Sequence, residues 1–551
     1  MNEFYIKNKC RAPGHQEDVI SIYHPGADAK IYDQKYWWSD QWDPIQFGLK
    51  YEPQKLFFIQ FGELLKNTPA IALFNTNAVN SDYANHAEDS KNSFLISAAW
   101  RSENILYSNR VASSKDSADL YLVDHLDLSY ETVNSGTSYK ILFSFGCEDC
   151  SNSAFLFDCR NCSDCFGCTG LRNKSYYIFN KPYSKEDYKK AIKNFDLGSY
   201  KKLTELKETY GQTILNFPRK YMYSFKIVDV VGDIVGNTKN CYQCFDVVGG
   251  EDSKYAVWGG MGMKDSYDGY GVGGGVDLLY ESVDSGISGS RVKFTIVVYR
   301  SHDVEYSFNC HNSNNLFGCV GLRNKSYCIL NRQYSKEDYE KLISQIIEHM
   351  NSMPYTDSKG RIYRYGEFFP PELSPFSYNE TIAQEYFPLT KEEAIAQGYT
   401  WKEDEKREYT INLTPESLPD HIKDVDDSIL TQNIGCSHQG TCNEQCTSAF
   451  RIIPQELEFY RKMNLPLPRL CPNCRHYSRL KQRNPLKLWK RRCMCNGKES
   501  RSQNQESIII YQNQTTHFHS DQSCPNEFET SYSPERKEII YCESCYNSEI
   551  V

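Results

Sequence analysis

Short apolar runs recur along residues 93–180 at intervals of roughly 10–14 residues. They begin at residues 93, 105, 120, 128, 140, 154, 165 and 175, and Asn, Ser, Asp and Gly fill the gaps between them. Short strands at such regular spacing, separated by turn-forming residues, are typical of a sandwich, a barrel or a solenoid. We favour a β-solenoid with two or three short strands in each coil, so that Asn and Cys side chains stack as ladders between coils. A two-sheet sandwich is the alternative.

The same pattern occurs twice in the chain. GLRNKSY and YSKEDY occur at 170–176 and 183–188, and again at 321–327 and 334–339, while DLSYETVNSG at 127–136 matches DLLYESVDSG at 277–286. The sequence therefore predicts two homologous β modules. Each module ends in a helix whose N-cap is the serine of SKED. Such a helix would cover the open strand edge at the end of the module.

Six cysteines of the first module have a spacing that also occurs in iron–sulfur proteins; they are Cys147, Cys150, Cys159, Cys162, Cys165 and Cys168. In the second module only Cys310 and Cys319 correspond to them, and valine, serine or leucine occupies the other positions. Valine and leucine cannot bind a metal, but they fill the same buried space as a free thiol. We therefore predict packed ladder cysteines. A metal cluster peculiar to the first module, or a disulfide, is the alternative.

The cysteines after residue 436 come in close pairs. Cys442 and Cys446 precede Cys471 and Cys474, and the last pair lies in CPNC. Two close pairs about 25 residues apart are typical of a zinc ribbon. Cys436 or His438 could replace one of the four ligands. The intervening PQELEFYRKM predicts a short helix that begins at the proline.

A second group follows, for which we predict the ligands Cys493, Cys524, Cys542 and Cys545. Cys495, His517 and His519 compete for the fourth place. The segment ETSYSPERKEIIY before Cys542 resembles a β-hairpin with its turn at SPER. Both groups can close with four protein ligands, which is typical of structural rather than catalytic zinc. The sequence therefore predicts two structural Zn²⁺ ions.

The N-terminal segment resembles a degenerate copy of this second ribbon. Residues 23–32 align without a gap on residues 532–541, which places His15, Asp33 and Tyr36 opposite Cys524, Cys542 and Cys545. Cys10 could stand for Cys493. The shape would then survive with fewer thiolates, and residual zinc binding by Cys10, His15 and Asp33 is the alternative.

The net charge of −9 excludes a chain that is a basic nucleic-acid binder as a whole. Residues 461–501, however, contain thirteen Lys and Arg and one acid, Glu499. We interpret this basic segment as a possible RNA- or DNA-binding patch in which Tyr477 and Trp489 could stack on bases. The candidate residues are Arg475, Arg479, Lys481, Arg483, Lys487, Trp489, Lys490, Arg491 and Arg492. The alternative is a basic face that docks on the acidic body.

The remaining signals favour a non-enzymatic protein. The N-terminus has no apolar signal segment, and no stretch approaches the roughly 18 apolar residues of a membrane helix, so we expect a cytoplasmic protein with reduced cysteines. No nucleophile–histidine–acid set is recognisable. Asp265, Asp268 and Asp277 would allow a solenoid enzyme that acts on a glycan, but a scaffold alone does not establish such an activity.

Four long motifs carry a resemblance to a known family. They are YDQKYWWSDQWDP, GLRNKSY, CNEQCTSAFRIIPQELEFYRKMNLPLPRLCPNCRH and FETSYSPERKEIIYCESCY. Together they resemble a family of bacterial zinc-ribbon proteins with a duplicated Cys/Asn-rich middle, common in ultra-small bacteria with reduced genomes. The resemblance covers nearly the whole chain. It implies zinc and a repeated middle region, and it implies no reaction.

These observations predict a mainly β protein with two tandem β-solenoid-like modules, capping helices and small C-terminal zinc ribbons. The predicted domains are a degenerate ribbon at 1–50, modules at 51–220 and 221–351, a linker at 352–435, and ribbons at 436–490 and 491–551. The expected function is a zinc-binding scaffold that contacts nucleic acid or a nucleoprotein complex. A protein–protein scaffold with purely structural zinc is the main alternative.

Overall fold

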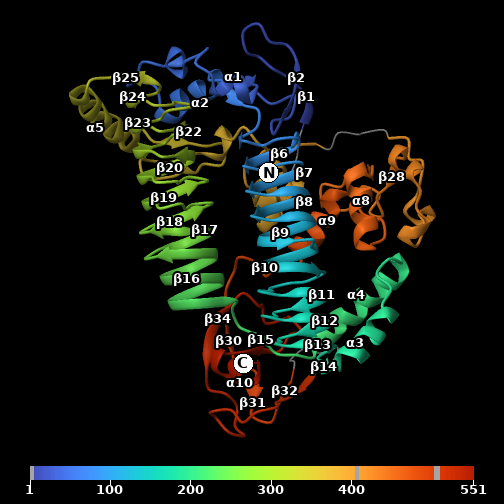
Figure 1. The fold of residues 1–551 in the computed structure, drawn as a ribbon. Helices are drawn as coiled ribbons and strands as arrows, with labels where there is room; N and C mark the ends of the chain where they lie inside the picture. Colours follow the sequence, from blue (N-terminus) through green and yellow to red (C-terminus); the bar gives the residue numbers. More distant parts are fainter. Residues whose placement is uncertain (1–4, 404–408, 502–508, 551) are drawn as a thin grey trace.

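The computed structural model describes residues 5–403, 409–501 and 509–550. The predicted domains 1–50, 352–435 and 491–551 each include a few residues outside these ranges. The described chain is mainly β, and two sheets of ten strands each contain most of its strand residues (Figure 1). We call them the first stack, residues 75–182, and the second stack, residues 224–333.

Nearly all strands of each stack run parallel to their neighbours. The first stack consists of β5 (Asn75–Thr76), β6 (Ala84–Glu88), β7 (Phe94–Trp100), β8 (Glu103–Ala112), β9 (Lys115–Asp127), β10 (Tyr130–Leu142), β11 (Ser151–Phe157), β12 (Ser163–Thr169), β13 (Ser175–Ile178) and β14 (Lys181–Pro182). The second stack consists of β16 (Ser224–Glu251), β17 (Lys254–Lys264), β18 (Tyr267–Tyr270), β19 (Asp277–Val283), β20 (Ser290–Tyr299), β21 (His302–Glu305), β22 (Phe308–His311), β23 (Asn314–Phe317), β24 (Ser326–Ile329) and β25 (Arg332–Gln333). Only the last strand of each stack, β14 or β25, pairs antiparallel.

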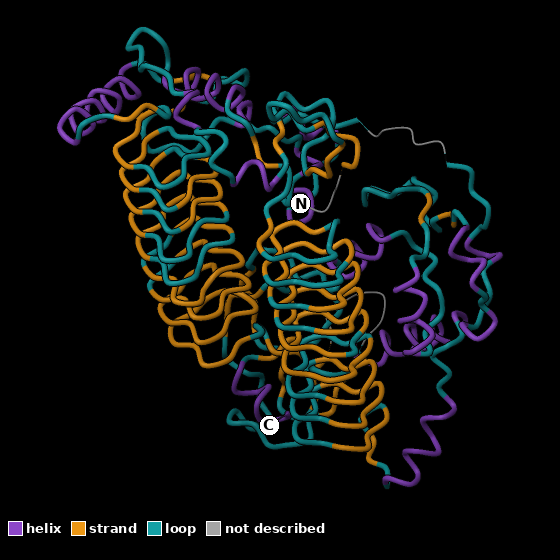
Figure 2. Tube along the Cα trace, turned by 45° about the horizontal axis from the view of Figure 1, so that its top comes forward, coloured by secondary structure: helices purple, strands orange, loops and turns teal. Residues whose placement is uncertain are grey.

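The chain advances by one strand position every twelve residues. Ser151 lies beside Ser163 and Ser163 lies beside Ser175, and the step becomes thirteen residues in the middle of the second stack, where Tyr267 lies beside Tyr280. Figure 2 shows the chain winding through successive turns that lie on one another. We call each such turn a coil. Because consecutive strands pair in parallel within one sheet, the two-sheet sandwich is not the arrangement of the described residues.

Within a coil, every third residue has a left-handed backbone. Asp149, Asn152 and Phe155 have φ values of 53°, 47° and 55°, and the residue after each of them is buried. A left-handed residue turns the chain sharply, and Asn, Asp and Gly tolerate this conformation best. The abundance of these residues between the apolar runs therefore follows from the tight coil.

The closely spaced cysteines occupy these buried positions. Cys147, Cys150, Cys159, Cys162, Cys165 and Cys168 are each at most 1% exposed. Each Sγ lies 3.3–3.6 Å from the backbone carbonyl oxygen two residues earlier. Val298 and Leu316 are buried in the second stack as well. The spacing of three is thus the spacing of inward-pointing positions in the coil, as the comparison of the two modules predicted.

The two stacks lie side by side and run in opposite directions (Figures 1 and 2). Side chains of the two stacks meet along their length: the ring centroids of Trp100 and Trp258 are 5.9 Å apart, and His86 Nε2 lies 3.2 Å from Asp284 Oδ2. From His86 through Trp100 to Arg110, the first stack therefore meets the second stack in reverse order, at Asp284, Trp258 and Asp246.

Both predicted capping helices are present. Ser184 accepts a hydrogen bond from the Asp187 amide at the start of α3 (Lys185–Ala191), and Ser335 does the same for Asp338 in α5 (Lys336–Ser352). Helix α4 (Tyr200–Leu215) follows α3 and contacts β11 and β12. Helix α2 (Phe57–Asn67) falls inside the predicted first module, yet its phenylalanines pack on Tyr306 and Phe317 of the second stack. A helix that precedes the first stack in sequence thus packs on the second stack, and no local sequence pattern predicts this contact.

Small units close the two ends of the paired stacks. The N-terminal unit, residues 5–48, contains β1 (Tyr5–Lys9), β2 (Asp18–Ser21), β3 (Ile31–Tyr32) and α1 (Gln34–Trp38). The C-terminal unit, residues 489–501 and 509–550, contains β30 (Trp489–Arg492), β31 (Cys495–Asn496), β32 (Glu499–Arg501), β33 (Ile510–Gln512), β34 (Glu527–Thr530), β35 (Ile540–Tyr541) and α10 (Glu543–Ile550). Strands β3 and β35 pair in parallel with β4 (Ala70–Ile71) and β15 (Arg219–Lys220), which lead into the first and second stacks.

Residues 352–403 and 409–480 cover the outer side of the first stack and the top of the molecule with short elements (Figure 1). They include β26 (Tyr355–Thr356), β27 (Ile362–Tyr363), α6 (Ala383–Tyr386), α7 (Lys391–Ala396), β28 (Ile434–Gly435), β29 (Ala449–Phe450), α8 (Pro454–Met463) and α9 (Pro472–Leu480). The predicted helix over PQELEFYRKM is α8, with its proline in the first turn. Among the described residues, no helix is long and apolar enough to cross a membrane.

Candidate metal centres

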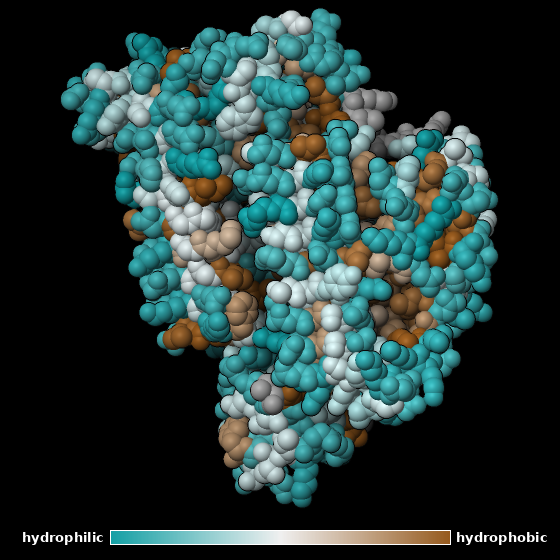
Figure 3. All heavy atoms as spheres, viewed as in Figure 1, coloured by the Kyte–Doolittle hydropathy of each residue, from teal (hydrophilic) through white to brown (hydrophobic). Residues whose placement is uncertain are grey.

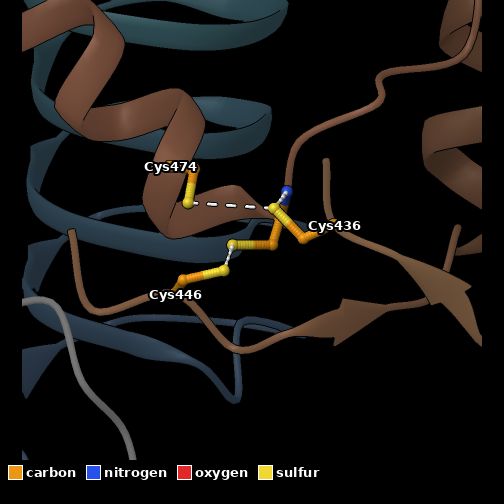
Figure 4. A group of neighbouring side chains, drawn as sticks. Cys436, Cys446 and Cys474 are labelled. Atoms are coloured by element: carbon orange, nitrogen blue, oxygen red, sulfur yellow. Dashed lines mark hydrogen bonds between the residues drawn. The ribbon is translucent and has the colours of Figure 1, made fainter. Parts of the chain in front are cut away.

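The first cysteine group lies where α9 begins against the β28–β29 hairpin (Figure 4). It consists of Cys436, Cys446, Cys471 and Cys474. The Sγ atoms of Cys436 and Cys474 are 3.8 Å apart, and those of Cys446 and Cys471 are 3.9 Å apart. Four sulfurs that bind one Zn²⁺ at about 2.3 Å in a tetrahedron lie about 3.8 Å from one another. The group therefore has the size of a tetrahedral zinc site.

Backbone amides point at this group. The Cys471 amide donates to Cys436 Sγ at 3.3 Å, and the Ser448 amide donates to Cys446 Sγ at 3.4 Å. Hydrogen bonds from neighbouring groups, first of all from the Cys436 thiol, lower the pKa of Cys446 to about 6. Such donors favour the thiolate, which is the form that binds metal.

The group differs from the predicted ligand set at one position. Cys446, Cys471 and Cys474 come together as predicted, but Cys436, the named alternative, completes the group in place of Cys442. Cys442 Sγ lies 3.7 Å from Cys474 Sγ and belongs to a neighbouring group with His438 and Glu444. The spacing of cysteines in the sequence cannot separate these two candidates, because Cys436 reaches the group from the preceding strand β28.

The second group contains the four cysteines of the predicted second site: Cys493, Cys524, Cys542 and Cys545. The Sγ atoms of Cys524 and Cys542 are 3.8 Å apart, and the Cys542 amide donates to Cys493 Sγ at 3.2 Å. The close pair Cys542 and Cys545 lies at the start of α10, just as Cys471 and Cys474 lie at the start of α9. Both helices thus present two thiols at their N-terminal end, where the helix dipole favours negative charge.

The predicted hairpin before Cys542 does not form. Strand β34 pairs with β30, and β35 pairs with β15 at the entrance of the second stack. Of the four candidates for the fourth place, Cys493 lies in this group. The three rivals, Cys495, His517 and His519, form a neighbouring group that shares Cys545.

The N-terminal unit shares strand pairings with the C-terminal unit: β1 pairs antiparallel with β2 as β30 does with β34, and β3 pairs in parallel with β4 as β35 does with β15. The Asp33 amide points at Cys10 Sγ at 3.5 Å, as the Cys542 amide points at Cys493. The metal-capable group here is Cys10, His15 and Glu17. Asp33, the predicted third ligand, instead accepts a hydrogen bond from the Lys35 amide and caps α1.

The basic segment is partly buried against the first stack. Arg475 and Arg479 are 5% and 2% exposed, and both pair with Asp119, whose side chain is fully buried. Arg475 also lies 3.2 Å from Glu456, which accepts hydrogen bonds from Tyr107 and Tyr460. These two arginines are therefore neutralised inside the protein.

A third arginine of the segment lies between the two stacks. Arg483 is 8% exposed and pairs with Asp246 of the second stack, which also lies 3.4 Å from Arg110 of the first. Tyr121 and Tyr386 surround the two guanidinium groups. The basic segment thus joins the stacks through a buried cluster of charges.

The other candidate nucleic-acid residues lie nearer to solvent. Lys481 pairs with Glu444, Arg492 pairs with Glu527, and Arg491 donates to the Ser533 carbonyl oxygen. Lys487 and Lys490 are exposed and Trp489 is half-buried. Nucleic-acid binding by this remaining surface stays a prediction.

The acids considered for a glycan enzyme lie on the second stack. Asp268 is on β18, Asp277 is on β19 and Asp265 follows β17. A groove of about 630 Å³ lies elsewhere, between the first stack and α8, and is lined by Asn80, Asn92, Asn104, Asp116 and Lys462 among others. The predicted acids therefore do not line this groove.

Neither a known protein-family profile nor a curated protein sequence matches this chain. Its function must accordingly be inferred from the cysteine groups and from the surfaces that the stacks present.

Proposed function

We propose that this chain is a non-enzymatic scaffold made of two β-solenoids and held at its C-terminal side by structural Zn²⁺. The observation that carries the proposal is the group of Cys436, Cys446, Cys471 and Cys474, whose sulfur separations match the edges of a tetrahedral zinc site. Four protein thiols leave no open position for water or substrate, and closed sites of this kind stabilise a fold.

The architecture supports a rigid scaffold. Twelve-residue coils bury one another, as in repeat proteins whose units stack on their neighbours. The two solenoids are joined through the buried Arg110, Asp246 and Arg483 cluster, so they form one body. The zinc-bearing segments lie over the outer side and the lower end of this body (Figure 1).

The experiment is a metal analysis of the full chain purified without added metal. We expect zinc and no iron. Tetrahedral sites made of four thiolates suit either metal, and bound iron would be recognised by a visible absorption band. Cys471→Ser should lose one zinc per chain. Cys162→Ser, which changes a ladder cysteine outside both groups, is the matched control and should keep the wild-type content. Absence of zinc, or equal content in both variants, would contradict the proposal.

The surface favours a protein partner over nucleic acid. Three of the nine candidate basic and aromatic residues are buried in ion pairs. On the second stack, by contrast, Val248 and Met261 lie on neighbouring coils, Ile287 lies two coils after Met261, and the three residues are 43%, 79% and 40% exposed. Figure 3 shows hydrophobic side chains among hydrophilic ones on the face of this stack that is turned to the viewer. Exposed apolar side chains that gather in this way mark interaction surfaces.

A measurement of RNA binding by the full chain distinguishes a protein-binding surface from a nucleic-acid-binding surface. Binding that weakens steeply with salt, and that is reduced by Lys487→Ala combined with Lys490→Ala, would support the nucleic-acid role. The proposal expects no such binding at low salt.

A further inference from the structure

The C-terminal unit contains more metal ligands than one ion can use. Beside the four-thiol group of Cys493, Cys524, Cys542 and Cys545 lies a second group, which consists of Cys495, His517, His519 and Cys545. Cys545 belongs to both groups. Seven side chains therefore form two four-membered sets that share one sulfur.

The second set has the dimensions of a tetrahedral site. Cys495 Sγ lies 3.6 Å from His517 Nδ1, and His519 Nε2 lies 3.3 Å from Cys545 Sγ. Ligands that bind Zn²⁺ at about 2.0 Å through nitrogen and about 2.3 Å through sulfur lie about 3.5 Å apart at the tetrahedral angle. The set is also largely buried: Cys495 and Cys545 are 0% exposed and His517 is 3% exposed.

Each histidine has its other ring nitrogen engaged. His517 Nε2 lies 2.9 Å from Glu549 Oε1, and both side chains are fully buried. His519 Nδ1 lies 2.6 Å from the Gln522 carbonyl oxygen. An imidazole that donates one N–H to a carboxylate or carbonyl presents its second nitrogen as a lone pair, which is how metal-binding histidines are oriented.

The Cys495 thiol of this set also accepts a hydrogen bond. Asn513 Nδ2 donates to Cys495 Sγ at 3.2 Å. Asn526 Nδ2 makes the corresponding contact to Cys542 Sγ in the neighbouring set, at 3.3 Å. Each set therefore has an amide donor that favours a thiolate.

We propose that the C-terminal unit binds two Zn²⁺ ions bridged by the thiolate of Cys545. One ion is bound by Cys493, Cys524 and Cys542 in addition to the bridge, and the other by Cys495, His517 and His519. This inference rests on the proposed function, in which the cysteine groups hold zinc. It raises the expected content of the chain from two zinc ions to three.

The same argument does not extend to the first group. Cys474 is shared there with His438, Cys442 and Glu444 in a similar way. His438 Nδ1, however, lies 3.1 Å from Glu444, and Glu444 also pairs with Lys481. The carboxylate of this set is thus engaged by a lysine, so we assign one ion to the first group.

The test counts zinc ions in the full chain by native mass spectrometry together with elemental analysis under reducing conditions. The wild type should hold three ions. His517→Ala and Cys495→Ser should each hold two, and Cys545→Ser should hold one. His125→Gln, which changes an exposed histidine of the first stack, and Cys10→Ser in the N-terminal unit should both hold three.

Substitution of the wild-type zinc by Co²⁺ provides a measurement that needs no variant. Two Co²⁺ ions that share a thiolate couple magnetically, so the electron paramagnetic resonance signal per cobalt should fall as the third ion binds. A wild type with two zinc ions, or three ions retained in His517→Ala, would overturn the bridged pair and leave the proposed function intact. A chain without zinc would overturn both.

Discussion

The carboxylate of Asp246 should be costly to remove from this protein. It is fully buried between the two stacks and accepts from Arg483 while it lies 3.4 Å from Arg110. The side chains of the two arginines are 5% and 2% exposed. Asp246→Asn keeps the shape of the side chain and removes its charge, so two guanidinium groups remain buried with no anion between them.

The magnitude follows from the cost of an unpaired buried charge. Loss of one partner from a buried pair costs about 3–5 kcal/mol. Because Asp246 serves two arginines, we expect Asp246→Asn to lower the free energy of unfolding by about 5 kcal/mol. Arg483→Met removes one cation and leaves the Arg110–Asp246 pair, so its expected cost is about 3 kcal/mol. The double variant should cost less than the sum of the two, because removing both partners leaves fewer unpaired charges.

The assay is urea unfolding followed by circular dichroism, in low salt and in high salt. The control is Asp303→Asn on the surface of the second stack, where Asp303 and Arg291 form a two-point ion pair and are 41% and 53% exposed. This exposed pair should contribute about 1 kcal/mol or less and should weaken in salt. The cost at Asp246 should be nearly independent of salt, since the cluster excludes solvent.

If Asp246→Asn and Asp303→Asn shifted the unfolding midpoint equally, the reasoning would be refuted. It would also fail if Asp246→Asn lost its effect in high salt, because that would show a solvent-accessible pair. A changed slope of the free energy with urea would indicate that the stacks separate before they unfold.

Two further predictions concern single residues. Ser335→Ala should lower the free energy of unfolding by about 1 kcal/mol through loss of the N-cap of α5, while Ser344→Ala on the exposed side of the same helix should change it little. Burial beside Phe74 and Tyr299 lowers the pKa of His311 to about 3, so between about pH 6.5 and 3 the unfolded chain binds a proton that the folded chain does not. Stability should fall as the pH falls through this window, by about 2 kcal/mol at pH 5, and His311→Phe should remove that contribution in unfolding measured against pH.

The features that the sequence predicts well are those with a local or periodic cause. The N-cap serines of the two SKED stretches identify α3 and α5, because each serine accepts from the backbone amide three residues later. The 151-residue repeat identifies the two stacks, and it assigns Cys147 and its neighbours to a buried ladder because Val298 occupies the same place in the second copy.

The features that it misses depend on contacts between distant segments. Asp119 and Asp246 are single acids in polar coils, and nothing near them indicates that arginines more than 230 residues away will pair with them. The thirteen basic residues therefore predict an exposed patch, whereas burial decides the role of three of them. The choice of Cys436 over Cys442 also depends on the folded chain, since Cys442 is nearer to Cys446 in sequence but Cys436 completes the four-thiol group.

The arginine of each GLRNKSY stretch takes part in the contact between a stack and one of the two end units. In the second stack, Arg323 of this stretch donates to the Trp37 carbonyl oxygen and lies over the rings of Trp37 and Trp42, which belong to the N-terminal unit. In the first stack, Arg172 pairs with Asp158, which accepts a hydrogen bond from Tyr546 of the C-terminal unit. Each unit thus docks on the last coils of one stack and pairs with the strand that enters the other.

The two end units achieve the same docking with different cores. The C-terminal unit is small and has five thiols at its centre, and a metal bound by them would supply the cohesion that a small apolar core lacks. The N-terminal unit has Cys10 but buries Tyr32, Tyr36, Trp37 and Trp42 together, and Tyr32 packs edge to face on Tyr36 and Trp42. At the positions that align with Cys542 and Cys545 it has Asp33, which caps α1, and the buried Tyr36, so aromatic burial rather than a second pair of thiols holds this unit together.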